Sequence, residues 1–121
     1  MSKFVIHETA TGIKFDLKAG NGQIILNSEV YESRSACLKG IRSVRKNAPK
    51  AHVENQTEEG FVTQAHPKFE IYQDKAGAFR FRLKSQNGRI IGFSEGYTAK
   101  AGCINGIESV MKNASGAQIE E

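Results

Sequence analysis

Apolar and polar residues alternate over several short stretches of the chain, which is the pattern of strands with one buried face. The stretch Ile13 to Lys18 places Ile, Phe and Leu on one face and Lys, Asp and Lys on the other, and Lys3 to Glu8 begins in the same way. The dipeptide Asn21-Gly22 tolerates the positive φ angles of a type I′ turn. We therefore expect a tight hairpin that leads into a third strand, Gln23 to Asn27.

The period changes from two to 3.6 residues after the third strand, as expected for a helix that lies on a sheet. The apolar stripe consists of Cys37, Gly40, Ile41, Val44 and Ala48. The basic residues point away from this stripe, namely Arg34, Lys39, Arg42, Arg45 and Lys46. Ser33 is the expected N-cap, Pro49 ends the helix, and Ala51 to Glu54 can supply a short closing strand.

All of these elements occur twice. Phe15 to Ala48 aligns without a gap on Phe81 to Ala114, and 18 of the 34 positions are identical, so the chain contains an internal duplication. The second copy has its turn at Asn87-Gly88, its expected N-cap at Thr98 and its closing strand at Ala117 to Glu120. A requirement of the fold must be met in both copies, whereas an active site normally needs each catalytic group once. The shared motif therefore concerns architecture.

Each copy is short for an independent fold. At about 55 to 60 residues, the hydrophobic stabilisation of one copy roughly cancels its loss of conformational entropy. We therefore expect one domain over residues 1–121, made of repeat 1 (3–54), a linker (55–67) and repeat 2 (68–120) around a shared core.

Two further expectations follow from the duplication. Glycine inside a helix costs about 1 kcal/mol relative to alanine, yet Gly40 recurs as Gly106 on the buried face. Close approach of the helix backbone to the sheet or to the other helix would explain both. If the halves meet about a pseudo-twofold axis, equivalent positions near it face each other. Asp16 and Arg82 are equivalent and opposite in charge, so we expect them to pair across the axis.

The repeated motif also carries a resemblance. It consists of Phe15, Leu17, Lys18, Asn21, Gly22, Ile24, Ile25, Ser28, Glu29 and Tyr31, then Cys37 to Ala48, and it returns as Phe79, Phe81, Leu83, Lys84, Asn87, Gly88, Ile90, Ile91, Ser94, Glu95 and Tyr97, then Cys103 to Ala114. This motif resembles the YegP-like family of small, mostly bacterial proteins of unknown function. The resemblance implies an α+β fold in which two βββαβ units share one folded-over, barrel-like antiparallel sheet with two packed helices. It implies no activity.

Charge and composition add little to this picture. The formal charge is +4 and the pI is about 9.2, without a long basic run, so the balance permits an acidic partner without requiring one. No apolar signal region and no run of 18 apolar residues is visible, and the cytoplasm is the expected location. A monomer is expected because the tandem copy internalises what would otherwise be a dimer contact, and pairing of sheet edges between chains is the alternative.

The exposed faces of the second strands provide one candidate binding surface. It consists of Lys14, Lys18, Arg80, Arg82 and Lys84. We expect these side chains to form a basic stripe across neighbouring strands, on which the phosphates of a nucleic acid or an acidic protein could rest. A solvated charged face without a ligand is the competing interpretation.

A second candidate is a duplicated polar cluster at the passage from the third strand to the helix. It comprises Asn21, Ser28, Glu29, Tyr31, Asn87, Ser94, Glu95 and Tyr97. Its carboxylate could receive hydrogen bonds from the amides at the helix start, and its serine could satisfy nearby backbone. The repeat contains no histidine that could activate the serine, which argues against catalysis. Binding of a small ligand requires that these groups share a cleft.

The remaining reactive residues have simpler interpretations. Cys37 and Cys103 form no CxxC motif and are expected to be buried thiols, with a disulfide between the halves as the alternative. The three histidines lack ligand spacing, and neither a metal nor a cofactor is expected. We therefore expect a non-enzymatic binding or accessory protein, with a small-molecule-binding protein or weak enzyme using the polar cluster as the alternative.

Overall fold

The computed structural model describes all residues, 1–121, and contains two copies of a β-β-β-α-β unit. The first consists of β1 (Lys3–Glu8), β2 (Ile13–Lys18), β3 (Ile24–Asn27), α1 (Arg34–Asn47), the short 3-10 turn η1 (Ala48–Lys50) and β4 (His52–Asn55). The second consists of β5 (Lys68–Gln73), β6 (Phe79–Lys84), β7 (Ile90–Phe93), α2 (Lys100–Asn113) and β8 (Gln118–Glu120). The predicted strands and helices are all present, with shifts of one residue at some ends.

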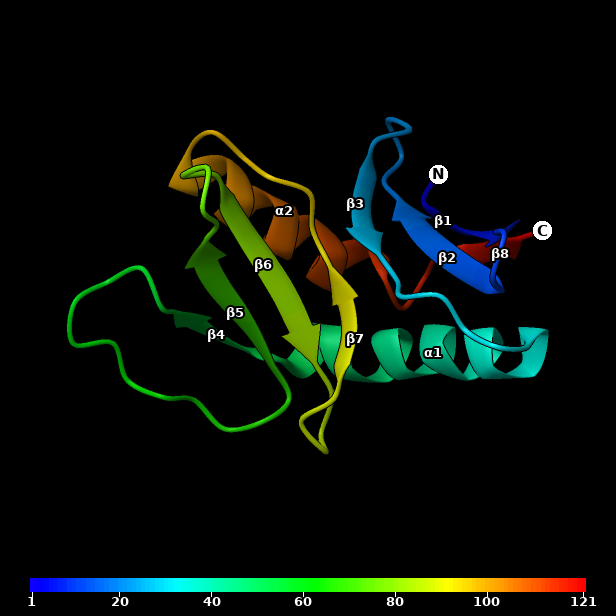
Figure 1. Ribbon diagram of the computed structural model, residues 1–121, viewed down its shortest axis with the longest axis horizontal. Coiled ribbons are helices and arrows are strands. Elements are labelled where there is room, and N and C mark those ends of the chain that lie inside the picture. Colours follow the sequence, from blue (N-terminus) through cyan, green and yellow to red (C-terminus); the bar gives the residue numbers. More distant parts are fainter.

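The eight strands form one sheet in the order β4-β5-β6-β7-β3-β2-β1-β8. Exchanging each strand for its equivalent in the other repeat gives the same order in reverse, which is the signature of a twofold relation centred between β3 and β7. These two strands meet at their C-terminal ends through one residue pair, Asn27 with Phe93 (Figure 1). The sheet ends on β4 and β8, so the barrel-like closure is not confirmed.

The repeats exchange their closing strands. β4 of repeat 1 pairs with β5 of repeat 2, and β8 of repeat 2 pairs with β1 of repeat 1. Both pairs are parallel, because each closing strand returns over a helix to run beside the first strand of the other repeat. The sheet is therefore mixed, and the expectation of a wholly antiparallel sheet was wrong. The exchange also places both chain ends at the same side of the molecule (Figure 1).

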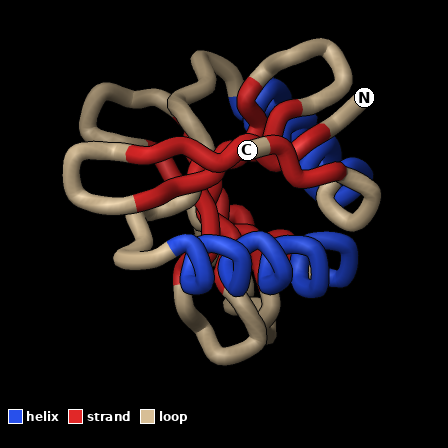
Figure 2. The backbone as a smooth tube through the Cα atoms, turned by 90° about the vertical axis from the view of Figure 1, so that its right-hand side faces the viewer, coloured by secondary structure: helices blue, strands red, loops and turns tan.

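The helices connect the two repeats as well. α1 contacts β2 of its own repeat and β7 of the other, while α2 contacts β6 and β3. Seen from the side, strands pass between the two helices, which lie one above the other in this view (Figure 2). Twenty buried hydrophobic residues from both repeats form one cluster. Its largest side chains include Phe4, Phe15, Phe69 and Phe81, which pack edge to face within each repeat at centroid distances of 5.7 and 5.6 Å.

The junction of β3 and β7, which we call the seam, does not contain the expected pair of residues. Asp16 pairs with His7 (2.8 Å) and Lys14 (3.3 Å), and Arg82 pairs with Glu70 (2.6 Å), so the expected pair of Asp16 with Arg82 does not form. Sheet pairing explains this, because β2 and β6 are separated by β3 and β7. Leu26 and its equivalent Gly92 face each other instead, since a Cβ at Gly92 would lie 2.7 Å from the Leu26 side chain. The two sides of the seam are complementary in size.

The predicted turns need a correction. Gly22 and Gly88 have φ angles of +85° and +82°, but no other residue type has a positive φ, so neither turn is type I′. The first loop closes through a hydrogen bond from Ala19 N to Gln23 O (2.9 Å), which leaves three residues between the paired positions. Such loops place glycine in the left-handed region after a type I turn. Asn21 contributes through its side chain, which accepts from Gln23 N at 3.0 Å.

Two expectations about the helix ends have different outcomes. Ser33 is the N-cap of α1, because its hydroxyl accepts from Ala36 N at 3.1 Å. Thr98 is not the N-cap of α2: the cap position is Ala99, which has no side-chain hydrogen bond. The duplication preserved the point at which the helix starts but not the capping hydroxyl.

Arg45 does not point into solvent as the helical pattern suggested. It is half-buried, lies over the Phe4 ring and donates to the Ala117 carbonyl at 2.6 Å.

An ionic cluster is buried beside the linker. Lys68 Nζ lies 2.7 Å from Glu54 and 3.2 Å from Glu70, and all three side chains are at most 5% exposed. The linker contributes through Gln56 Nε2 and the backbone amide of Gln64, which donate to Glu54 at 2.6 and 2.7 Å. Burial by itself would raise the pKa of Glu54, but these hydrogen bonds and the one from Lys68 outweigh it and hold the pKa at about 2.

The equivalent pair in the other repeat is exposed. Lys3 and Glu120 are 2.9 Å apart, with side chains 40% and 54% exposed. The exchange of β4 and β8 produces both pairs, and the linker contacts only the first.

Candidate functional site

The five residues of the candidate basic stripe do not lie on neighbouring strands. Lys14 and Lys18 are on β2 and the other three are on β6, with β3 and β7 in between. Four of the five cations lie within ion-pair distance of a carboxylate. Lys14 pairs with Asp16, Arg80 with Asp74, and both Arg82 and Lys84 with Glu70, at 2.6 to 3.3 Å. Their role in binding stays a prediction, but an anion would have to compete with these carboxylates for four of the five side chains.

The two serines of the polar cluster hold the backbone together. Ser28 Oγ accepts from Phe15 N at 2.9 Å and donates to Glu29 O at 2.7 Å, and Ser94 makes the same two bonds with Phe81 N and Glu95 O. Both serines are buried. These bonds fasten the end of the third strand to the second strand in each repeat.

Replacing Ser28 with alanine is expected to lower the free energy of unfolding by about 1–3 kcal/mol, because the buried amide of Phe15 loses an acceptor. Ser94→Ala should have a similar effect. Urea unfolding measures both, and Ser35→Ala, at an exposed helix position, is the control. An unchanged stability of the Ser28 variant would contradict a structural role.

The two tyrosines explain the glycines on the buried helix faces. A Cβ at Gly40 would lie 2.3 Å from Tyr31 Oη and 3.1 Å from Phe15, and one at Gly106 would lie 2.4 Å from Tyr97 Oη. Burial, followed by the charge of Glu29, raises the pKa of Tyr31 to about 12. The predicted close approach of the helix to the sheet therefore exists, and it is made by the aromatic side chains of the strands β2 and β6 together with the two tyrosines.

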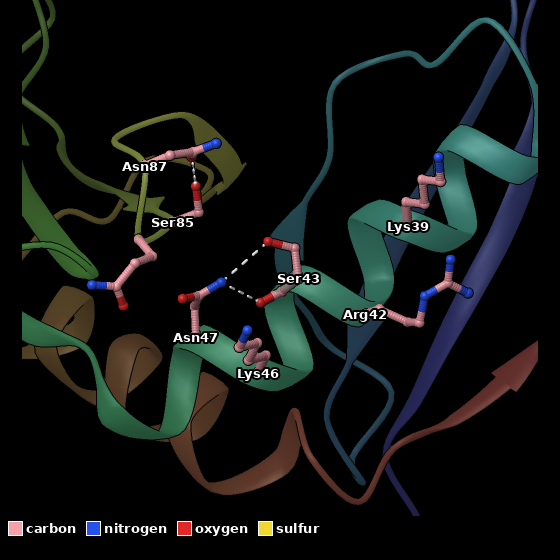
Figure 3. A pocket seen from close by; sticks show the side chains of 8 residues that line it. Lys39, Arg42, Ser43, Lys46, Asn47, Ser85 and Asn87 are labelled. Carbon is pink, nitrogen blue, oxygen red and sulfur yellow. Dashed lines mark hydrogen bonds between the residues drawn. The ribbon is translucent and has the colours of Figure 1, made fainter.

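A groove between the two repeats brings together polar residues that the sequence did not connect (Figure 3). It has a volume of about 390 Å³ and runs between α1 and the hairpin that joins β6 to β7. We call it the α1 groove, and its lining residues are Lys39, Arg42, Ser43, Lys46, Asn47, Ser85, Gln86 and Asn87. An adjoining hollow of about 290 Å³ shares four of these residues and adds Tyr31 and Arg89. Tyr31 and Asn87 of the polar cluster thus share a cleft across the repeats.

The cations around the α1 groove have no carboxylate partner. Lys39, Arg42, Lys46 and Arg89 are exposed and take part in none of the ion pairs of the structure, whereas the cations of β6 are all paired. Unpaired cations beside a concave surface attract anions more strongly than paired ones.

The equivalent positions in the other repeat are not basic, with one exception. Asn105, Glu108, Lys112 and Gln23 stand where the α1 groove has Lys39, Arg42, Lys46 and Arg89. Ser85 and Gln86 are likewise replaced, by Ala19 and Gly20. Four of the eight lining residues are therefore kept at the equivalent positions, namely Ser43, Lys46, Asn47 and Asn87, whereas most of the cations are found around the α1 groove alone. This is the distribution expected for a single binding site.

Asn47 is the least usual residue in the groove. It is 4% exposed, and its Nδ2 donates to the Ser43 carbonyl (2.8 Å) and hydroxyl (3.2 Å). Its Oδ1 is buried and has no hydrogen-bond partner. A buried acceptor without a partner costs about 1–3 kcal/mol.

Other reactive groups do not form a site. Cys37 and Cys103 are buried and unbonded, and burial raises the pKa of both thiols, that of Cys103 to about 11. No three His, Cys, Asp or Glu side chains are close enough together to hold a metal ion. None of the helices has the length and apolar character to cross a membrane.

A family comparison is consistent with the duplicated fold. The family model described as a domain of unknown function, DUF1508, matches the chain twice, over residues 9–55 and 74–121. The chain belongs to the DUF1508 family. Each match begins directly after the first strand of a repeat and covers the rest of that repeat. The relatives that follow confirm the YegP-like resemblance.

Relatives in the DUF1508 family include chains of two lengths. The UPF0339 protein plu2779 of Photorhabdus laumondii is 37% identical over 107 residues, which cover 88% of this chain and 81% of the relative. A UPF0339 protein of Treponema denticola is 59% identical over 54 residues, which cover 45% of this chain and 93% of the relative, so its length is that of one repeat. The solution structure of E. coli yegP, a protein of unknown function, has a TM-score of 0.80, 32% identity and coverage of 98% and 90%.

The α1 groove was missed because its two sides belong to different repeats. The sequence did show basic residues on the outer face of α1 and the change from Arg42 to Glu108. Nothing in the periodicity indicated that the second hairpin lies against the first helix. The asymmetry of charge between the copies was the signal that could have found the site.

Proposed function

We propose that the protein is a non-enzymatic binding module whose α1 groove holds the phosphates of a nucleic acid. The observation that carries the proposal is the placement of four unpaired cations, Lys39, Arg42, Lys46 and Arg89, around the α1 groove, whereas the equivalent positions of the other repeat hold only one cation. We take the acting form to be a cytoplasmic monomer, because the strand exchange uses within one chain the pairing that two chains would otherwise share.

The arrangement of the cations favours a chain of phosphates over a single anion. Lys39, Arg42 and Lys46 follow one another at i, i+3 and i+7 along one side of α1, which spans about 10 Å. Successive anionic groups fit such a row, and phosphate contacts of this kind dominate affinity for nucleic acids. The lining side chains are Lys, Arg, Ser, Asn and Gln, which hold and orient anions, whereas acid–base catalysis uses groups that titrate near neutral pH.

A pair of matched charge reversals tests the proposal. Lys46→Glu is expected to weaken binding of a fluorescent single-stranded oligonucleotide about tenfold or more, because it puts a carboxylate where a phosphate would rest. It should also reduce the slope of log K against log salt by about 0.7 for each phosphate that the variant no longer neutralises. Fluorescence anisotropy at several salt concentrations measures both quantities.

Lys112→Glu is the matched control, because Lys112 is the equivalent residue of repeat 2 and is likewise exposed and unpaired. Both variants change the net charge by the same amount. Equal weakening by the two substitutions would show a non-specific charge effect and contradict a site in the α1 groove. Failure of the unaltered protein to bind at low salt would contradict the proposal altogether.

A further inference from the structure

We infer that the nucleic acid is RNA and that a ribose 2′-hydroxyl donates a hydrogen bond to Asn47 Oδ1. This inference rests on the proposed function and names the ligand class of the same groove. It starts from the one buried acceptor in the groove that the protein itself leaves without a partner.

The orientation of the Asn47 amide is fixed by its neighbours. The Ser43 carbonyl can only accept a hydrogen bond, so the Asn47 nitrogen must face it, at 2.8 Å. Oδ1 then points away from Ser43 (Figure 3). The hydroxyl of Ser85 is not available as a donor because it already donates to Asn87 Oδ1.

The fold does not require this unpaired acceptor. Asn113, the equivalent residue of α2, makes the same bonds to the Ser109 carbonyl (2.8 Å) and hydroxyl (3.1 Å). It is half-buried, and its Oδ1 is not among the buried atoms without a partner. The hydrogen bonds from the Asn side chain to the preceding Ser are thus common to both helices, whereas only α1, which has the cations, has the buried acceptor without a partner.

The combination of cations and a free acceptor selects a particular ligand chemistry. Lys46 and Asn47 both line the α1 groove, so a ligand group that satisfies Oδ1 shares this groove with a phosphate held by Lys46. A phosphodiester offers only acceptors, and the sugar of DNA offers no donor within a strand. The ribose 2′-hydroxyl is a donor attached beside the phosphate, and it is the group by which proteins distinguish RNA from DNA.

The test compares three single-stranded probes of one sequence: oligouridine, oligodeoxyuridine and 2′-O-methyl oligouridine. The unaltered protein should bind oligouridine about fivefold more tightly than either of the others, the value of about one hydrogen bond. The side-chain amide signals of Asn47 in NMR spectra should shift with oligouridine and stay in place with the 2′-O-methyl probe. Equal affinity for the three probes would overturn the inference.

Asn47→Ala should remove the preference for oligouridine, so that the three probes bind this variant with equal affinity. Asn113→Ala is the matched control, because it removes the equivalent hydrogen bonds to Ser109 from α2. This variant should keep the preference for oligouridine. Loss of the preference in both variants would overturn the inference. If Asn47→Ala does not fold, the 2′-O-methyl comparison on the unaltered protein still decides.

Two further measurements distinguish RNA from a free nucleotide, and the phosphate-binding groove from the ribose contact. Uridine 3′-monophosphate has the same ribose and phosphate, so equal affinity for it and for oligouridine would overturn RNA in favour of a free nucleotide. If Lys46→Glu weakens binding of all three probes while the unaltered protein binds them with equal affinity, the result supports the proposed function and overturns the ribose contact. If no probe binds at low salt, both the proposed function and the ribose contact are overturned.

Discussion

Replacing Lys68 with alanine is expected to lower the free energy of unfolding by about 3–5 kcal/mol, because it leaves two buried carboxylates without their shared ammonium group. Lys68 Nζ lies between Glu54 and Glu70, at 2.7 and 3.2 Å. Glu70 retains Arg82 and Lys84, but Glu54 has no other cation among its ion pairs. Urea unfolding followed by circular dichroism gives the change.

The duplication provides a matched control for this substitution. Lys3 and Glu120 are the equivalents of Lys68 and Glu54, and their pair is exposed. Lys3→Ala should change the stability by no more than about 1 kcal/mol, the usual range for an exposed ion pair. Equal effects of the two substitutions on the free energy of unfolding would show that burial beside the linker does not strengthen the contribution of Lys68.

The same cluster predicts sensitivity to acid. The pKa of Glu54 is about 2 in the folded protein and lies near 4.5 without these interactions, so its contribution is complete above about pH 4.5 and is lost as the pH falls toward 2. The lowered pKa of Glu70, for which burial is outweighed by hydrogen bonds from Arg82, Lys68 and Lys84, acts in the same direction. The urea concentration at the midpoint of unfolding should fall as the pH is lowered over this range. For Lys68→Ala, this midpoint should fall less steeply.

Phe81→Ala is expected to lower the free energy of unfolding by about 3–5 kcal/mol and to unfold both repeats in one transition. Phe81 is fully buried and packs on Phe69 and Tyr97. Because α2 also contacts β3, and α1 also contacts β7, loss of packing in repeat 2 withdraws support from repeat 1.

Amide NMR signals from each repeat provide separate probes of this transition. Urea titration should give the same midpoint for residues of β2 and β6 in the Phe81 variant. Phe61→Ala is a control, because Phe61 lies in the linker and is partly exposed, and it should have little effect. Separate midpoints for the two repeats would contradict a common core.

The local structure could be predicted because it depends on periodicity. Alternation located the strands, the apolar stripe from Cys37 to Ala48 located α1, and Ser33 marked its start. The exchange of β4 and β8 could not be predicted in this way, because periodicity shows which face of a strand is buried but not which edge it joins. The turn type failed for a related reason: Asn-Gly permits several loop lengths, and the hairpin register selects one.

The candidate site was harder to predict because it depends on what lies beside each charge. The cations of β6 looked free in the sequence, but the register of β5 brings Glu70 opposite Arg82 and the hairpin brings Asp74 to Arg80. The cations of α1 that line the groove, Lys39, Arg42 and Lys46, looked the same and lack such partners. Only the fold separates the two groups, since the second hairpin belongs to a part of the chain far from α1.

The unequal pair at the seam, Leu26 and Gly92, makes the halves of this chain non-interchangeable. Two copies of repeat 1 would bring two leucines into a space that holds one, and two copies of repeat 2 would leave that space empty. Each half therefore recognises its complement and rejects its own kind. The mismatch therefore disfavours any dimer in which two copies of the same repeat pair with each other.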